Sequence, residues 1–138
     1  MRHLAFIALL ILPFSPALAQ QTDTTYYTTT FNRLDQDKDG GFTLIDLQRI
    51  SAKEFKRTDD NKNGTLSLIE YLYGIPANRQ DVVDRFTKRF KASDTDGDGQ
   101  VTLDEDAAFC QRLVAAADKN SDGIVTLAEY LTVNGGEQ

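Results

Sequence analysis

Four short stretches of the chain place acidic and amide side chains at the same regular spacing. Each stretch is twelve residues long, with Asp or Asn at positions 1, 3 and 5, glycine at position 6 and a carboxylate at position 12. The stretches are residues 35–46, 59–70, 94–105 and 118–129. Oxygen donors at this spacing suit Ca²⁺, a hard cation that takes about six to eight oxygen ligands. The pattern therefore predicts four calcium-binding loops.

Within each loop, the predicted ligands are the side chains at positions 1, 3, 5, 9 and 12 and the backbone carbonyl at position 7. Glycine at position 6 allows the sharp turn that gathers these groups around one ion. The predicted metal ligands are Asp35, Asp37, Asp39, Gly41, Thr43, Asp46, Asp59, Asn61, Asn63, Thr65, Ser67, Glu70, Asp94, Asp96, Asp98, Gln100, Thr102, Glu105, Asp118, Asn120, Asp122, Ile124, Thr126 and Glu129.

Repetition separates these loops from ordinary acidic turns. An isolated match would be read as a solvated turn, but the last three loops satisfy D-x-[DN]-x-[DN]-G-x5-E in full, and the first departs from it only at Asp46. The side chain of Asp46 is one methylene shorter than Glu, so it chelates a cation with both oxygens less readily. We expect the first loop to bind Ca²⁺ more weakly, to complete its shell with water, or to accept the smaller Mg²⁺.

The number of ligand carboxylates differs among the loops. Side-chain carboxylates at positions 1, 3, 5, 9 and 12 number four in the first and third loops, two in the second and three in the fourth. Affinity rises with ligand charge and with a bidentate Glu at position 12. The third loop, with Glu105, is therefore predicted to bind calcium most tightly, followed by the fourth.

Helices must hold these loops in place. Residues 47–58 and 106–117 contain no Gly or Pro, so each is predicted to be one continuous helix about 18 Å long. Between the second and third loops, residues 74–78 contain Gly74 and Pro76 and predict a turn, with Asn78 and Asp81 capping the next helix. The spacing therefore predicts that loop 2 pairs with loop 3, and loop 1 with loop 4.

These loops resemble EF-hands, and four of them together resemble the calmodulin-like superfamily, especially its bacterial secreted and periplasmic members. The resemblance covers roughly residues 26–133. The predicted pairing of loops 1 and 4 implies one compact domain, and the resemblance implies an all-α fold of four helix-loop-helix units over residues 31–133, with short β-pairings between loops. It also implies binding of up to four Ca²⁺. The apolar residues predicted to line the inner faces are Phe31, Leu34, Leu47, Ile50, Phe55, Phe109, Leu113, Val114, Tyr130 and Leu131.

Residues 1–19 resemble a secretory signal peptide. A basic start precedes a short apolar run, and the segment ends in Ala17-Leu18-Ala19, which predicts cleavage after Ala19. The apolar run is too short to span a bilayer, which disfavours a membrane anchor. The expected location is the periplasm or the extracellular space. Residues 20–30 are predicted to be a flexible Thr-rich segment and residues 134–138 a flexible tail.

Composition excludes several classes of function. The net charge is −6, from 15 Lys and Arg against 21 Asp and Glu, which predicts no nucleic-acid partner and no membrane partner after cleavage. The single histidine, His3, lies in the leader, so the remaining chain cannot form a Ser-His or Cys-His nucleophile, and we expect no enzyme. Cys110 is predicted to be a buried thiol in a monomer; the alternative is a disulfide-linked dimer.

Two binding functions fit the loops. The first is a secreted or periplasmic Ca²⁺ buffer or calcium-stabilised module. The alternative is a sensor that binds a specific, unidentified protein partner when loaded with metal. Sensors of the calmodulin type rely on a methionine-rich groove. Residues 20–138 contain no methionine, so the sequence favours the buffer or structural role.

Overall fold

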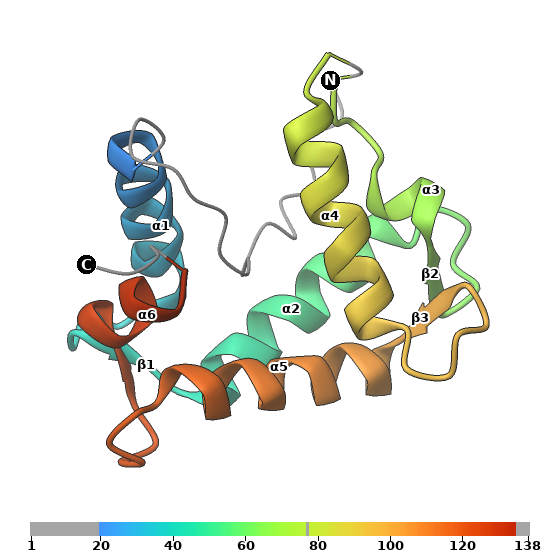
Figure 1. Ribbon diagram of the computed structural model, residues 1–138. Coiled ribbons are helices and arrows are strands. Elements are labelled where there is room, and N and C mark those ends of the chain that lie inside the picture. Colours follow the sequence, from blue (N-terminus) through green and yellow to red (C-terminus); the bar gives the residue numbers. More distant parts are fainter. Residues whose placement is uncertain (1–19, 77, 135–138) are drawn as a thin grey trace. The chain divides into compact units, whose positions relative to one another are not determined.

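The computed structural model describes residues 20–76 and 78–134. Over these residues the helices are α1 (Gln20–Leu34), α2 (Leu44–Thr58), α3 (Leu68–Tyr71), α4 (Gln80–Ser93), α5 (Leu103–Ala117) and α6 (Leu127–Asn134) (Figure 1). The strands are β1 (Gly41–Phe42), β2 (Thr65–Ser67), β3 (Gln100–Thr102) and β4 (Val125–Thr126). The prediction of a mostly helical fold with short strand pairs between loops is confirmed.

Two parts of the predicted organisation fall largely outside this range. The signal peptide, residues 1–19, precedes it, and the predicted tail follows it except for Asn134, the last residue of α6. Among the described helices, none has both the length and the apolar character needed to cross a bilayer.

The strands join the loops in the predicted pairs. β1 pairs antiparallel with β4, and β2 pairs antiparallel with β3. At position 8 of the loops, Phe42 faces Val125 and Leu66 faces Val101, and all four side chains are at most 1% exposed. Each sheet therefore holds two loops together through backbone hydrogen bonds and a buried apolar pair.

Contacts group the chain into two compact units, one for each pair of loops. Within the described range, the first unit holds residues 49–109 with loops 2 and 3, and the second holds residues up to 48 and from 110 onward, with loops 1 and 4. The boundary falls inside α2 and inside α5, each of which is one unbroken helix as predicted. That the chain forms a single compact domain stays a prediction.

Interlocking aromatic rings form the core of the unit that contains loops 1 and 4. The ring of Tyr130, on α6, is fully buried, and its centroid lies 6.2 Å from that of Tyr27, 5.9 Å from Phe31 and 5.8 Å from Phe42. The contacts with Tyr27 and Phe42 are edge-to-face, a favoured geometry for aromatic pairs. Helices α1 and α6 are thereby fastened to each other and to β1.

The unit that contains loops 2 and 3 has its own aromatic core. Tyr71, at the end of α3, packs edge-on against Phe86 and Phe90 of α4, with ring centroids 6.0 and 5.5 Å apart. The guanidinium of Arg89 lies 5.1 Å from the centre of the Phe109 ring on α5, within cation–π range. Although α3 is only one helical turn long, it contributes to this core because the Tyr71 ring contacts α4.

Two local predictions are wrong. Residues 20–30 belong to helix α1 and are not a flexible segment: Tyr27 and Thr30 are buried, because the aromatic core just described holds the helix. The predicted Asn78 cap is absent: α4 begins after Arg79, which makes no side-chain cap, and Asp81 instead accepts two hydrogen bonds of 3.0 Å from the Arg79 guanidinium.

The side chains predicted to line the inner faces are buried, apart from Ile50 and Leu131, which are half-buried. Cys110 forms no disulfide among the described residues, and its side chain is 0% exposed. A disulfide between two chains would therefore require α5 to open around it first.

Candidate metal centres

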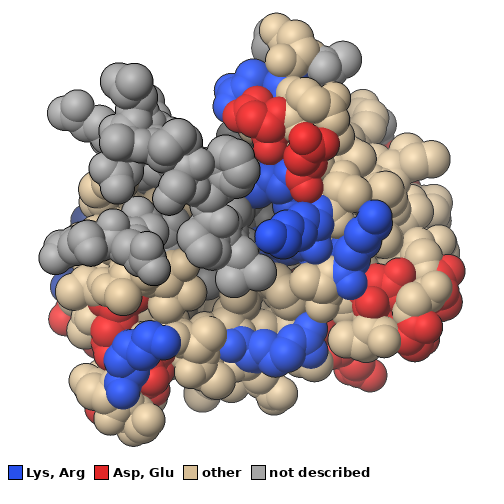
Figure 2. All heavy atoms as spheres, in the orientation of Figure 1, with Lys and Arg blue, Asp and Glu red and all other residues tan. Residues whose placement is uncertain are grey.

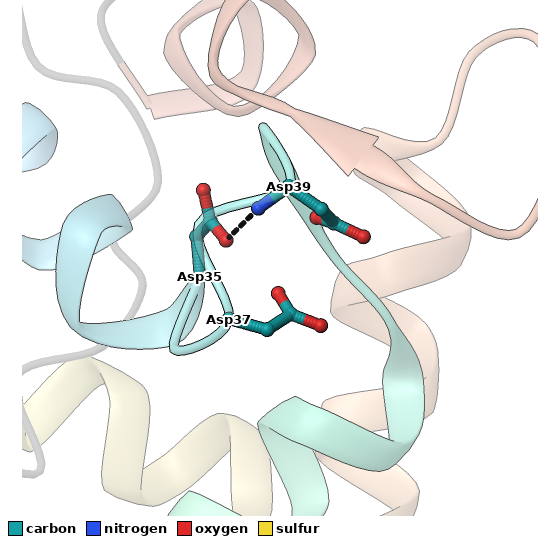
Figure 3. Close-up of side chains that lie close together, drawn as sticks. All are labelled: Asp35, Asp37 and Asp39. Atoms are coloured by element: carbon teal, nitrogen blue, oxygen red, sulfur yellow. Dashed lines mark hydrogen bonds between the residues drawn. The ribbon is translucent and has the colours of Figure 1, made fainter.

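The first side chain of each loop organises the turn that follows it. In loop 1, Asp35 accepts a hydrogen bond of 3.1 Å from the backbone N–H of Asp39 (Figure 3). It accepts another of 3.1 Å from Gly40, and Asp39 in turn accepts one from Gly41. Loops 2 and 4 repeat this arrangement around Asp59 and Asp118. In loop 3, Asp94 accepts from Gly97 and Gly99. The backbone amides thus turn the oxygen-bearing side chains toward the loop interior.

The backbone at position 4 of each loop has a positive φ, in the left-handed region. The sequence pattern does not specify this conformation. Lys38, Lys62 and Ser121 have φ of 59°, whereas the third loop has glycine there, Gly97, with φ of 74°. A left-handed backbone costs a non-glycine residue about 1–2 kcal/mol. The third loop, with glycine at this position, avoids this strain.

The carboxylates of loops 1 and 3 are close enough to share one ion. Oxygens of Asp35, Asp37 and Asp39 lie within 4.8 Å of one another, and so do oxygens of Asp94, Asp96 and Asp98. Since Ca²⁺–oxygen distances are about 2.3–2.6 Å, two ligands of one ion lie at most about 5 Å apart. Both clusters therefore fit a single calcium ion, and Figure 3 shows the three side chains of loop 1 around the same turn.

Loop 2 has amide oxygens at positions 3 and 5, and loop 4 has one at position 3, where loops 1 and 3 have carboxylates. In loop 2, Asn61 and Asn63 accept backbone hydrogen bonds of 2.9 Å within the loop. Oε2 of Glu70 accepts from the backbone and hydroxyl of Ser67, but Oε1 is buried and has no hydrogen-bond partner among the described residues. A buried carboxylate oxygen without a partner is unfavourable. A cation in loop 2 would satisfy it, so this loop also fits calcium.

Position 12 closes each loop and begins the following helix. The carboxylates of Asp46, Glu70, Glu105 and Glu129 each accept hydrogen bonds from the backbone and hydroxyl of the position 9 residue, at 2.7–3.0 Å. The position 12 N–H returns a bond to that hydroxyl at 3.2–3.4 Å. This arrangement is a capping box, present in all four loops.

The glutamates of loops 3 and 4 also reach the start of their own loops. Oε1 of Glu105 accepts from the backbone and hydroxyl of Thr95, and Oε1 of Glu129 accepts from the backbone of Lys119 and Asn120. These carboxylates already lie across the loop, where a position 12 ligand must be. Thr95 is a residue that sequence reasoning missed, because position 2 carries no signal in the pattern.

Hydrogen bonds lower the pKa of these glutamates. Donation from the Thr102 backbone, opposed by partial burial and reinforced by Thr95, lowers the pKa of Glu105 from 4.5 to about 2. The Thr126 backbone and hydroxyl lower the pKa of Glu129. Burial raises the pKa of Glu70, but hydrogen bonds from Ser67 outweigh it and the net change is downward. All three therefore stay ionised, and ready for a cation, well into the acid range.

Acid is expected to destabilise the calcium-free protein through Glu105. Because its folded-state pKa lies below its unfolded value, the contribution of Glu105 to stability is complete above pH 4.5 and is lost as pH falls toward about 2. Urea unfolding of the metal-free chain at a series of pH values should show this loss, and Glu105→Gln should flatten the slope over that window. The same slope in both proteins would contradict the assignment.

Comparison with known proteins agrees with this geometry. The EF hand family model matches residues 87–105, which include the second half of α4 and the whole third loop. The chain is 34% identical to parvalbumin beta of Gadus morhua subsp. callarias over 84 residues, covering 55% of this chain and 74% of parvalbumin. The chain belongs to the EF-hand family of calcium-binding proteins. Like other members of this family, it binds calcium through EF-hand loops.

Two other relatives match a larger share of the chain at lower identity. The 16 kDa calcium-binding protein of Schistosoma mansoni is 28% identical over 129 residues, covering 76% of this chain and 90% of the relative. Calcium-dependent protein kinase 22 of Arabidopsis thaliana is also 28% identical over 129 residues, but this chain spans only 26% of its length.

Proposed function

We propose that this EF-hand protein is a calcium buffer or calcium-stabilised module that binds four Ca²⁺ outside the cytoplasm. The 24 side chains and carbonyls predicted from the loop pattern would be its ligands, with Mg²⁺ able to replace Ca²⁺ in loop 1, where Asp46 is short. No enzymatic activity is proposed, since the kinase match covers only about a quarter of that enzyme.

The main support for the buffer role is that the aromatic side chains of each unit are buried against one another. Tyr27, Phe31, Phe42 and Tyr130 contact one another in one unit. A sensor of the calmodulin type must instead expose a pliable methionine-rich groove on loading. Residues 20–138 carry no methionine, and opening would break several edge-to-face contacts at once.

Charge gives calcium a stabilising role. The four loops concentrate 13 of the 21 acidic residues at ligand positions. In Figure 2, Asp and Glu side chains gather over the loops beside β2 and β3, while basic and acidic side chains are mixed over α4. Residues 20–138 have a net charge of −7, from 14 basic and 21 acidic residues, and four Ca²⁺ would change it to +1. Removing this repulsion stabilises the folded state.

A calcium titration followed by small-angle scattering and by a dye that fluoresces on apolar surface tests the buffer role. The buffer role predicts a smaller radius of gyration and a higher melting temperature with no rise in dye fluorescence. A strong rise in fluorescence on loading would contradict it and would favour the sensor.

One observation favours the sensor as a second candidate. Ile69 and Tyr73, one helical turn apart at α3 and the turn after it, are 82% and 62% exposed. Exposed apolar side chains of this kind can anchor a specific protein partner. If the protein is only a buffer, replacing both residues with Ser should reduce the local surface hydrophobicity and change no other property.

Location outside the cytoplasm rests on residues 1–19, whose charged start, apolar run and Ala-x-Ala end are typical of a signal peptide. N-terminal sequencing of exported protein should begin at Gln20. Full-length protein retained in the cytoplasm would contradict this location. Burial of Cys110 supports a monomer, which a non-reducing gel would check against the disulfide-linked dimer.

A further inference from the structure

A line of hydrogen bonds runs from the second loop to the third across the β2–β3 pair. Oδ1 of Asn63, at position 5 of loop 2, accepts from the Thr65 backbone at 2.9 Å and from the Thr65 hydroxyl at 3.0 Å. That hydroxyl also lies 2.9 Å from Oε1 of Gln100. The Gln100 backbone N–H donates to Oδ1 of Asp98, at position 5 of loop 3, at 2.7 Å. Thr65 and Gln100 therefore connect two predicted metal ligands.

The Thr65 hydroxyl has one proton for two acceptors. It can donate to Asn63 or to Gln100, but not to both at once. A cation bound to Oδ1 of Asn63 would repel the hydroxyl proton and use the same lone pairs, so the proton would move to Gln100. The stronger bond to Gln100 would then hold the start of β3, and with it the Asp98 side chain that the Gln100 backbone contacts.

The other pair of loops has no such connection. Position 7 is Gly41 in loop 1 and Ile124 in loop 4, so neither side chain can donate or accept a hydrogen bond. The two residues instead fit together sterically: a Cβ on Gly41 would lie 2.3 Å from Cγ2 of Ile124. The position 7 pair is therefore polar between loops 2 and 3 and apolar between loops 1 and 4. The second pair of loops can serve as a control for the first.

We propose that Thr65 and Gln100 are positioning residues that couple calcium binding in loop 2 to calcium binding in loop 3. This rests on the proposal that both loops bind calcium. Because coupling between two sites is reciprocal, filling either loop raises the affinity of the other by the same factor. One hydrogen bond contributes about a two- to tenfold change in affinity, which sets the size of the effect carried by the side chains.

Amide NMR signals of two glycines report each loop separately. The N–H of Gly64 donates to Asp59 at 2.9 Å, and the N–H of Gly99 donates to Asp94 at 3.0 Å, so both signals should shift when the aspartate binds an ion. Calcium titration of the ¹⁵N-labelled chain gives the affinity of loop 3 from Gly99. The same titration in Glu70→Gln, which disables loop 2, gives the affinity without coupling, and the ratio of the two is the coupling factor.

We expect Thr65→Val and Gln100→Leu each to lower this factor about two- to tenfold, because they keep side-chain size and remove the hydrogen-bonding group. Thr65→Ser, which keeps the hydroxyl, should retain the factor. In all three variants the coupling between loops 1 and 4, followed at Gly40 and Gly123, should stay unchanged.

Several results would overturn the proposal. These are a coupling factor of one in the unaltered chain, the same factor after Thr65→Val and Gln100→Leu, or a loss in affinity that leaves the factor unchanged, which would indicate a structural role alone. If Gly64 and Gly99 did not shift with calcium in the unaltered chain, calcium binding in these loops would itself be refuted.

Discussion

Replacing Glu105 with Gln is expected to lower the calcium affinity of loop 3 by about tenfold or more, since it removes the charge and one oxygen of a bidentate ligand. The side chain already lies across the loop, held by Thr95 and Thr102, so little rearrangement is needed for it to bind an ion. Asp46→Asn, at the same position of loop 1, should cost about threefold or less, because the shorter side chain contributes less to the shell.

Calorimetric titration of the two variants and the unaltered chain provides this comparison, with the Gly99 and Gly40 amide signals assigning each loss to its loop. Glu105→Gln also weakens the hydrogen bonds from Thr95 and Thr102 in the metal-free state, which reduces the net loss. Equal losses in the two variants would contradict the predicted order of affinities.

Tyr130→Ala is expected to destabilise the unit that contains loops 1 and 4 by about 3 kcal/mol or more, the usual cost of removing a large buried aromatic ring. Tyr130 is fully buried and contacts Tyr27, Phe31 and Phe42, so the cavity would lie where α1, β1 and α6 meet. Chemical unfolding of the metal-free protein measures the loss. Saturating calcium should restore part of the stability by mass action.

Tyr73→Ala provides the matched control, because that side chain is 62% exposed. It removes the same atoms from the surface and should change the free energy of unfolding by about 0.5 kcal/mol or less. Similar losses for Tyr130→Ala and Tyr73→Ala would show that the aromatic core does not stabilise the fold as described.

Features that repeat in the sequence were predictable. The ligand spacing identifies all four loops, and the capping boxes follow from a Ser or Thr three residues before each final carboxylate. The strand pairs follow from spacing alone: residues 47–58 and 106–117 are unbroken helices, while Gly74 and Pro76 allow the chain to turn between loops 2 and 3. Each of these depends on local chemistry or on chain length.

Features that depend on distant contacts were not predictable. The polar composition of residues 20–30 predicts flexibility, but the rings of Tyr27 and Phe31 meet Tyr130 of α6 and hold α1 in place. Asn78 has a suitable side chain for a cap, yet α4 begins one residue later than that cap requires. The roles of Thr95 and Gln100 arise from the folded loops, in positions where the pattern accepts any residue.

Each of the four EF-hand loops is expected to bind one calcium ion. Native mass spectrometry of the chain with excess Ca²⁺, repeated with Asp35→Asn, Asp59→Asn, Asp94→Asn and Asp118→Asn, tests it most directly. We expect four ions on the unaltered chain, and weakened binding of a different single ion in each variant. Fewer than four ions on the unaltered chain, or a variant that binds like it, would show that the loops do not each bind one ion.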